Sequence, residues 1–161
     1  MRSMTSYAAV IGPGDDDDSE LLTLAEQVGR GLAEHGLIIV TGGLHGVMAA
    51  ACRGASSVGG MTVGLLPGDD RAAGNQWLSV ALPTGLGELR NGLVVRAADV
   101  IVAVGGSWGT LSEIALAVRT GTPVVALRPW SMTGVGAAPS PVVEAESAAD
   151  AVAHAVTMIT I

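Results

Sequence analysis

Two glycine-rich segments share the spacing Gly-Gly-x-x-Gly, which suits the binding of a phosphate or another anion. They are residues 42–46 (GGLHG) and 105–109 (GGSWG), and each follows an apolar run and begins a helical pattern. The backbone N–H groups of such a loop lie beside a helix N-terminus, whose dipole favours negative charge. Glycine can also serve merely to turn the chain, but two loops of one spacing favour a ligand site. The residues expected to bind the ligand or its phosphate are Gly42, Gly43, His45, Gly46, Gly105, Gly106, Ser107, Gly109 and Thr110.

Two ionisable side chains near these loops each have two interpretations. Glu113 closes the segment 110–113 (TLSE), which fits a capping box in which the glutamate folds back on the N-cap amide. Alternatively, it lies in the first turn behind the loop and faces the ligand as a general base or a stabiliser of a cation. Arg90, one turn into the preceding helix, is either a solvated charge or a bidentate partner for phosphate or carboxylate.

A tryptophan, three histidines and an acidic run are further candidates for ligand or metal binding. Trp108, inside the second loop, either stacks on a base or belongs to the core. His45 is expected to contact the ligand because it lies in a glycine loop, whereas His35 and His154 are expected at the surface. The acidic run 15–18 (DDDD) is interpreted as helix capping rather than a metal site, since consecutive acids seldom converge on one ion.

Several enzyme classes are excluded or disfavoured by residues that the sequence lacks. The first turn, residues 12–17 (GPGDDD), lacks the third glycine of a dinucleotide fingerprint, and its carboxylates oppose a pyrophosphate. All eight basic residues are arginines, so no lysine can form a pyridoxal phosphate Schiff base, a P-loop or a Ser-Lys dyad. The single cysteine, Cys52, excludes an internal disulfide and a zinc site of several thiolates. We therefore expect no metal and no resident cofactor.

The composition of the 161 residues indicates an apolar, acidic chain. Apolar residues make up 49%, charged residues make up 14%, and the net charge is −7. So few charges predict that another copy covers some apolar surface, giving a homodimer or larger homo-oligomer. The negative charge argues against a nucleic-acid partner. The N-terminal apolar run is too short for a signal peptide, and no run is long enough to span a membrane, so a cytoplasmic protein is expected.

Strand and helix patterns alternate along the whole chain. Gly36 and Gly121 are placed to end the first and fourth helices. Such alternation predicts one doubly wound, Rossmann-like α/β domain over residues 1–161, with a mostly parallel sheet. The expected strands are 7–11, 37–40, 61–66, 78–82, 100–104 and 123–127. The expected helices are about 19–35, 44–57, 86–98 and 150–158, together with one that residues 105–106 open and that runs to 120. The expected loops are 68–76 and 129–141.

Three segments together resemble one known family. Residues 104–113 (VGGSWGTLSE) resemble the P-G-G-x-G-T-x-x-E signature of the LONELY GUY-type proteins, often mislabelled lysine decarboxylases. Residues 42–48 (GGLHGVM) resemble that family's earlier glycine-rich loop, and residues 89–91 (LRN) fall at its arginine-lysine pair. The resemblance runs from about residue 7 to 127 and is best to a short bacterial branch, related to DprA-like proteins and molybdenum cofactor carrier proteins.

In the enzymes of this family, the signature implies the activity of a nucleoside 5′-monophosphate phosphoribohydrolase. Water cleaves the N-glycosidic bond and releases a free base and ribose 5-phosphate. By the resemblance, Glu113 stabilises the ribosyl cation or activates water, and Arg90 is its catalytic partner. The amides of residues 106–110 and the hydroxyl of Thr110 would hold the phosphate.

Differences from the family pattern leave two functions in competition. Asn91 stands in place of the family lysine and Val104 in place of the signature proline, while Arg90 and Glu113 are retained. Carrier proteins of the same fold bind a phosphate-bearing pterin cofactor without chemistry. The preferred hypothesis is therefore binding of a nucleotide, pterin cofactor or similar phosphorylated small molecule at the two loops, as carrier or sensor. The alternative is the phosphoribohydrolase; lysine decarboxylation is excluded because the chain has no lysine.

Overall fold

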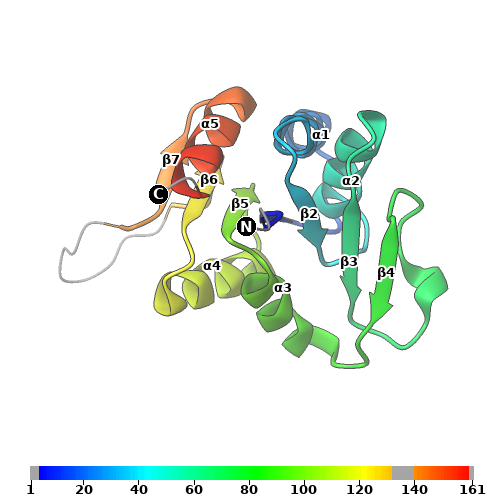
Figure 1. The fold of residues 1–161 in the computed structure, drawn as a ribbon. Helices are drawn as coiled ribbons and strands as arrows, with labels where there is room; N and C mark the ends of the chain where they lie inside the picture. Colours follow the sequence, from blue (N-terminus) through cyan, green and yellow to red (C-terminus); the bar gives the residue numbers. More distant parts are fainter. Residues whose placement is uncertain (1–3, 132–139, 160–161) are drawn as a thin grey trace.

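A single parallel sheet organises the chain (Figure 1). The computed structural model describes residues 4–131 and 140–159. Within them, seven strands pair in the order β4-β3-β2-β1-β5-β6-β7, every neighbouring pair being parallel. The doubly wound α/β class predicted from the sequence is confirmed. The strands are β1 (Tyr7–Ile11), β2 (Ile38–Thr41), β3 (Thr62–Leu66), β4 (Val80–Pro83), β5 (Val100–Val104), β6 (Val124–Leu127) and β7 (Val143–Ala145).

Helices cover both faces of this sheet. Three of them, α1, α2 and α5, lie over one face, and α3 and α4 lie over the other (Figure 1). The helices are α1 (Ser19–Glu34), α2 (Val47–Ser57), α3 (Asn91–Ala97), α4 (Trp108–Thr120) and α5 (Ala148–Ile159), with short 3-10 helices η1 (Arg71–Ala73) and η2 (Gly87–Arg90). Within the described residues, none of these helices combines the length and apolarity needed to span a bilayer.

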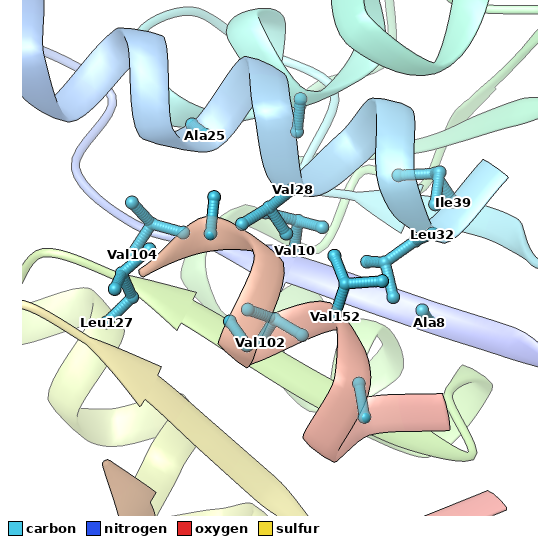
Figure 2. Close-up of a cluster of buried hydrophobic side chains, with 14 of the residues drawn as sticks. Ala8, Val10, Ala25, Val28, Leu32, Ile39, Val102, Val104, Leu127 and Val152 are labelled. Atoms are coloured by element: carbon cyan, nitrogen blue, oxygen red, sulfur yellow. The ribbon is translucent and has the colours of Figure 1, made fainter. Parts of the chain in front are cut away.

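The central strands β1, β2, β5 and β6 divide their side chains between two hydrophobic cores. On β1, Ala8 and Val10 enter the core under α1, α2 and α5, whereas Ala9 and Ile11 enter the core under α3 and α4. Figure 2 shows Val28 of α1 and Val152 of α5 within the first core. A fully buried aliphatic side chain stabilises the fold by about 1.5–3 kcal/mol, so the central strands anchor the loops that follow them.

Two local predictions about helix ends are confirmed. Asp18 is the N-cap of α1, and its Oδ1 accepts hydrogen bonds from Glu20 N (2.9 Å) and Leu21 N (3.3 Å). The acidic run therefore caps a helix, as expected. Gly36 and Gly121 both have φ of +80°, the left-handed conformation that ends a helix at low cost to glycine.

Three element predictions need correction. The strand β7 was missed, because three residues carry too little pattern to be recognised. The expected helix 44–57 begins only at Val47, and the expected helix 86–98 is divided into η2 and α3. Of the expected loop 129–141, residues 132–139 lie outside the described part of the chain.

The strand order places a topological switch point between β1 and β5. The chain proceeds from β1 outward to β4, and then crosses to β5 on the other side of β1. The loops after β1 and β5 therefore diverge and leave a crevice at the carboxyl edge of the sheet, where ligands of such folds bind.

Candidate functional site

A pocket of about 590 Å³ occupies this crevice. The loop after β1 contributes Gly12 and Gly14 to it, and the N-terminal part of α4 contributes Ser107, Trp108, Gly109, Thr110, Ser112 and Glu113. The segment around η2 adds Arg90 and Asn91 from a third direction. Backbone amides, hydroxyls, one cation and two carboxyl groups, those of Glu88 and Glu113, thus converge on one space.

The N-terminus of α4 presents donors to the pocket. Ser107 is the N-cap, and its Oγ accepts a hydrogen bond from Thr110 N (3.2 Å) and lies 2.9 Å from Thr110 Oγ1. Gly109 leaves the first turn open, since a Cβ built there would meet no heavy atom closer than 3.9 Å. An anion can therefore approach the free amides and the positive end of the helix dipole.

Arg90, the last residue of η2, is buried and lines the same pocket as this helix end. Its side chain is only 8% exposed, and among the described residues its Nε has no hydrogen-bond partner. Its Nη1 donates to the side-chain oxygen of Asn91. A Cβ at Gly42 would lie 2.7 Å from the guanidinium, so the absence of a side chain there makes room for the arginine. The interpretation as a solvated helix charge is wrong.

An unpartnered donor in a buried cation is energetically costly. Leaving it unsatisfied costs more than about 1–3 kcal/mol because the group is charged. Burial lowers the pKa of the Arg90 guanidinium, and the negative charge of Glu113 works in the opposite direction. Because arginine retains its proton in proteins, the group remains a cation that an oxyanion would complete.

Glu113 is the second buried charge of the site. It is 8% exposed and lines the same pocket as Arg90. Burial raises the pKa of Glu113 to about 7, although the charge of Arg90 acts to lower it. A carboxyl group that titrates near neutral pH can donate or accept a proton, as general acid–base chemistry requires.

The capping-box interpretation of Glu113 is wrong. The N-cap of α4 is Ser107, so Thr110 lies inside the helix and Glu113 belongs to its second turn, not the first. From that position the glutamate lines the pocket. The Ser/Thr-x-x-Glu pattern at residues 110–113 therefore lies one turn inside the helix and does not cap it.

The first glycine loop is placed differently from the second. From residues 42–46, only Leu44 is among the described residues that line the pocket. Gly43 and Gly46 have φ of +78° and +60°, which makes them turning residues. Asn75 Nδ2 holds the loop by donating to the carbonyl oxygens of Gly43 (3.3 Å) and Leu44 (3.0 Å). His45 is exposed outside the pocket lining.

The first two glycines of the second loop also serve packing. Gly105 has φ of +74°, and a Cβ there would lie 2.8 Å from Leu21. A Cβ at Gly106 would meet the indole of Trp130. Of the predicted site residues, the structure therefore brings together Arg90, Glu113, Ser107, Gly109 and Thr110, and leaves the others behind or beside the pocket wall.

Several lining residues were missed from the sequence. The turn at Gly12 and Gly14 was not predicted as a ligand site, because it lacks the third glycine of a dinucleotide fingerprint and aspartates follow it. Residues 15–18 are not among the described residues that line the pocket. Met48, Pro67 and Glu88 carried no recognisable signal. The switch point between β1 and β5 was the signal that could have identified the turn at Gly12.

Trp108 stands at the mouth of the pocket. Its side chain is 78% exposed, so the interpretation as a core residue is wrong. Its ring centroid lies 5.3 Å from that of Trp130, with the planes at 87°. Such an edge-to-face pair is a favourable aromatic geometry.

The remaining histidines and acids form no metal site in the described parts of the chain. No group of three or more His, Cys, Asp or Glu side chains is placed there to hold an ion. His35 is exposed and bonds the carbonyl of Gly31, and the partly exposed His154 lies 3.4 Å from Asp150.

With this geometry established, residues 5–158 match the model of the SLOG cluster4 family. The chain belongs to this family. An uncharacterised protein of Archaeoglobus fulgidus is 40% identical over 120 residues, which cover 74% of this chain and 78% of that protein.

Solved structures extend the family relationship to carrier proteins. The molybdenum cofactor binding protein of Rippkaea orientalis has a TM-score of 0.87 and 29% identity over 98% of this chain and 99% of that one. The molybdenum cofactor carrier protein of Chlamydomonas reinhardtii has a TM-score of 0.84 and 31% identity over 98% and 100%. DNA processing protein A of Helicobacter pylori shares the fold, with a TM-score of 0.70 and 17% identity over 94% and 80%. The similarity to molybdenum cofactor carrier proteins was predicted from the sequence, and the likeness to DNA processing protein A shows a shared fold.

Proposed function

We propose that this chain, acting as one domain over residues 1–161, binds a phosphorylated small molecule as a carrier. The preferred cargo is a phosphate-bearing pterin of the molybdenum cofactor class. The full-length similarity to a molybdenum cofactor carrier protein and a molybdenum cofactor binding protein supports this choice. The proposed contacts with the phosphate come from Arg90 and from the amides and hydroxyls of Ser107, Gly109 and Thr110.

The observation that carries the proposal is the unpartnered Nε of buried Arg90, which lines the same pocket as the α4 N-terminus. A phosphate bound there would accept from the guanidinium on one side and from helix amides on the other. The pocket of about 590 Å³ falls within the range of about 300–1,000 Å³ typical of small-molecule sites.

The remaining predicted loop residues take supporting roles in this proposal. Gly42 makes room for the guanidinium, and Gly43 and Gly46 hold the turn before α2. Gly105 and Gly106 shape the turn that aims the amides of α4. His45 is proposed to contact a ligand only if that ligand extends beyond the pocket wall.

Cofactor retention tests the carrier proposal. The purified protein is mixed without oxygen with molybdenum cofactor released from a molybdoenzyme and then passed over a gel-filtration column. Co-eluting molybdenum is measured by mass spectrometry and the pterin by the fluorescence of its oxidation product. Wild type and Arg96→Gln, a control exposed on the same helix as Asn91, should retain the cofactor. Arg90→Gln should lose it; equal retention by Arg90→Gln, or none by wild type, would contradict the proposal.

A second candidate function rests on Glu113. Because burial raises the pKa of this carboxyl group to about 7 beside a cationic partner, the pair could serve the LONELY GUY-type hydrolysis of a nucleoside 5′-monophosphate. The carboxylate would stabilise the ribosyl cation or activate water. Incubation with AMP should then release adenine and ribose 5-phosphate from wild type but not from Glu113→Gln prepared in parallel. Equal release by both would reveal a contaminant and remove this candidate.

Self-association is also proposed. Leu89 of η2 is 80% exposed, and Leu93 of α3 and Val118 of α4 are exposed as well. Exposed apolar side chains on the helices of one face favour a second copy of the chain that covers them. The net charge of −7 disfavours nucleic acid as the partner. Light scattering should give at least twice the 16.0 kDa chain mass; a monomer would contradict it.

A further inference from the structure

We propose that Trp108 is the platform on which the ligand's planar ring stacks, so that the site selects a phosphate joined to a heteroaromatic ring. This inference rests on the proposed phosphate site and specifies the class of molecule that occupies it. It also gives the exposed indole of Trp108 a role in binding, which phosphate binding by the helix N-terminus and Arg90 does not require.

The position of Trp108 joins it to the phosphate site. It is the first residue of α4, directly after the N-cap Ser107 and directly before Gly109. All three residues line the pocket. A phosphate held by the first-turn amides would therefore leave the rest of a ligand within reach of the indole.

The exposure of Trp108 is unusual for this chain. The sequence has no phenylalanine, one tyrosine and three tryptophans. One of these rare rings is left 78% exposed at the mouth of a pocket. Exposing a ring of this size forgoes a large hydrophobic gain, and a stacking ligand would recover it.

The second indole holds the first in place. Trp130 meets Trp108 edge to face, with centroids 5.3 Å apart. Trp130 itself rests on the backbone at Gly106, where an added Cβ would lie 2.6 Å from Cγ and 2.8 Å from Nε1 of the indole. The platform is thus supported from below by the loop that precedes α4, which reduces the entropy lost when a ring stacks on it.

Apolar side chains in the same lining suit a ring as well. Leu44 and Met48, from the first loop and α2, line the pocket together with Trp108. A ligand that binds through its phosphate at Arg90 would therefore find apolar surface for its ring in this pocket. Stacking of a base on an aromatic side chain is worth about 1–3 kcal/mol by alanine substitution, which corresponds to roughly 5-fold to 150-fold in affinity.

Calorimetry with matched probes tests this inference. Inorganic phosphate and ribose 5-phosphate carry no ring, whereas AMP and neopterin monophosphate carry one. Each is titrated into wild type, Trp108→Ala, Trp108→Phe and Trp77→Phe; Trp77 packs against Arg53 outside the pocket and is the control. Light scattering on every variant monitors the oligomeric state.

The inference predicts a selective loss. Trp108→Ala should bind AMP or neopterin monophosphate about 10-fold or more weaker than wild type, with unchanged affinity for ribose 5-phosphate. Trp108→Phe should recover most of the loss, and Trp77→Phe should match wild type. Unchanged binding of both ring-bearing probes by Trp108→Ala would overturn the inference but leave the phosphate site intact. Equal loss of all probes, or a changed oligomeric state, would make Trp108 an interface residue. Failure of every probe to bind wild type would overturn the phosphate site and the platform together.

Discussion

The two glycine loops share one spacing and differ in almost every contact. At 42–46, the glycines turn the chain, make room for Arg90 and pack against backbone, and α2 begins without a side-chain N-cap. At 105–109, Ser107 caps α4, and Gly109 opens its first turn to the pocket. The same pattern thus shapes the chain in one place and, in the proposed site, opens a helix N-terminus to the ligand in the other.

The strand order explains this difference. The second loop follows β5, which borders the switch point, whereas the first follows β2, one strand further out. Only loops that border the crevice present their amides to it. A glycine motif therefore predicts a phosphate site only together with the position of its strand in the sheet.

The largest expected effect comes from the first loop. Gly46 has φ of +60° and ψ of −131°, and a Cβ there would lie 2.9 Å from Gly14 Cα. Gly46→Ala should lower the free energy of unfolding by about 3 kcal/mol, through backbone strain and the clash. Urea unfolding measures it, with Gly59→Ala as the control because its φ of +75° is similar and its surroundings are open. Equal losses would show that packing at Gly46 contributes nothing.

The buried carboxyl group behind the second loop should make stability depend on pH. The pKa of Glu113 is raised by burial from 4.5 to about 7, so the folded state binds more protons than the unfolded state between these values. Stability should therefore fall as the pH rises through this window, and the penalty is complete above pH 7. Relative to wild type, Glu113→Gln should gain on the order of 3 kcal/mol between pH 4.5 and 8. A difference independent of pH would refute the buried-carboxyl account.

Arg90 should carry the largest effect on binding. Arg90→Gln removes the positive charge and should therefore weaken the binding of inorganic phosphate or ribose 5-phosphate by about 100-fold, equivalent to about 2.7 kcal/mol. Arg96→Gln, exposed on α3, is the control for net charge. Gly42→Ala, which would displace the guanidinium, should reproduce part of the loss. Full phosphate affinity in Arg90→Gln would show that Arg90 does not bind the phosphate.

The smallest effects belong to the α4 cap. Ser107→Ala should cost about 1 kcal/mol of stability because the N-cap hydrogen bond to Thr110 N is lost. Gly109→Ala should stabilise by about 0.5–1 kcal/mol, since alanine favours a helix and the site is open, while its methyl group weakens phosphate binding. Thermal unfolding with and without phosphate separates the two effects. A loss of stability in Gly109→Ala would show that Gly109 serves packing, as the glycines of the first loop do.

Most of the fold was predictable because it depends on local pattern. Buried parallel strands appear as continuous apolar runs, and Asp18, Gly36 and Gly121 mark helix ends with residue types that suit them. The short β7 was not predictable, since three residues carry too little pattern.

The site was predictable only in part, because burial depends on distant segments. Arg90 is buried because Gly42, which lies 48 positions earlier in the chain, leaves space for it. The role of Glu113 depends on which of two hydroxyl residues caps α4, and the sequence pattern fits both. Gly12 and Gly14 join the pocket only through the pairing of β1 with β5.

Phosphate is proposed to bind at the second loop and at Arg90, and not at the first loop. Titration of ¹⁵N-labelled protein with ribose 5-phosphate, followed by the amide and Arg90 Nε resonances, tests it residue by residue. We predict the largest shift changes at Ser107, Gly109, Thr110 and the Arg90 Nε–H, with small changes at residues 42–46. Changes centred on residues 42–46, with a silent Arg90 Nε–H, would contradict the account.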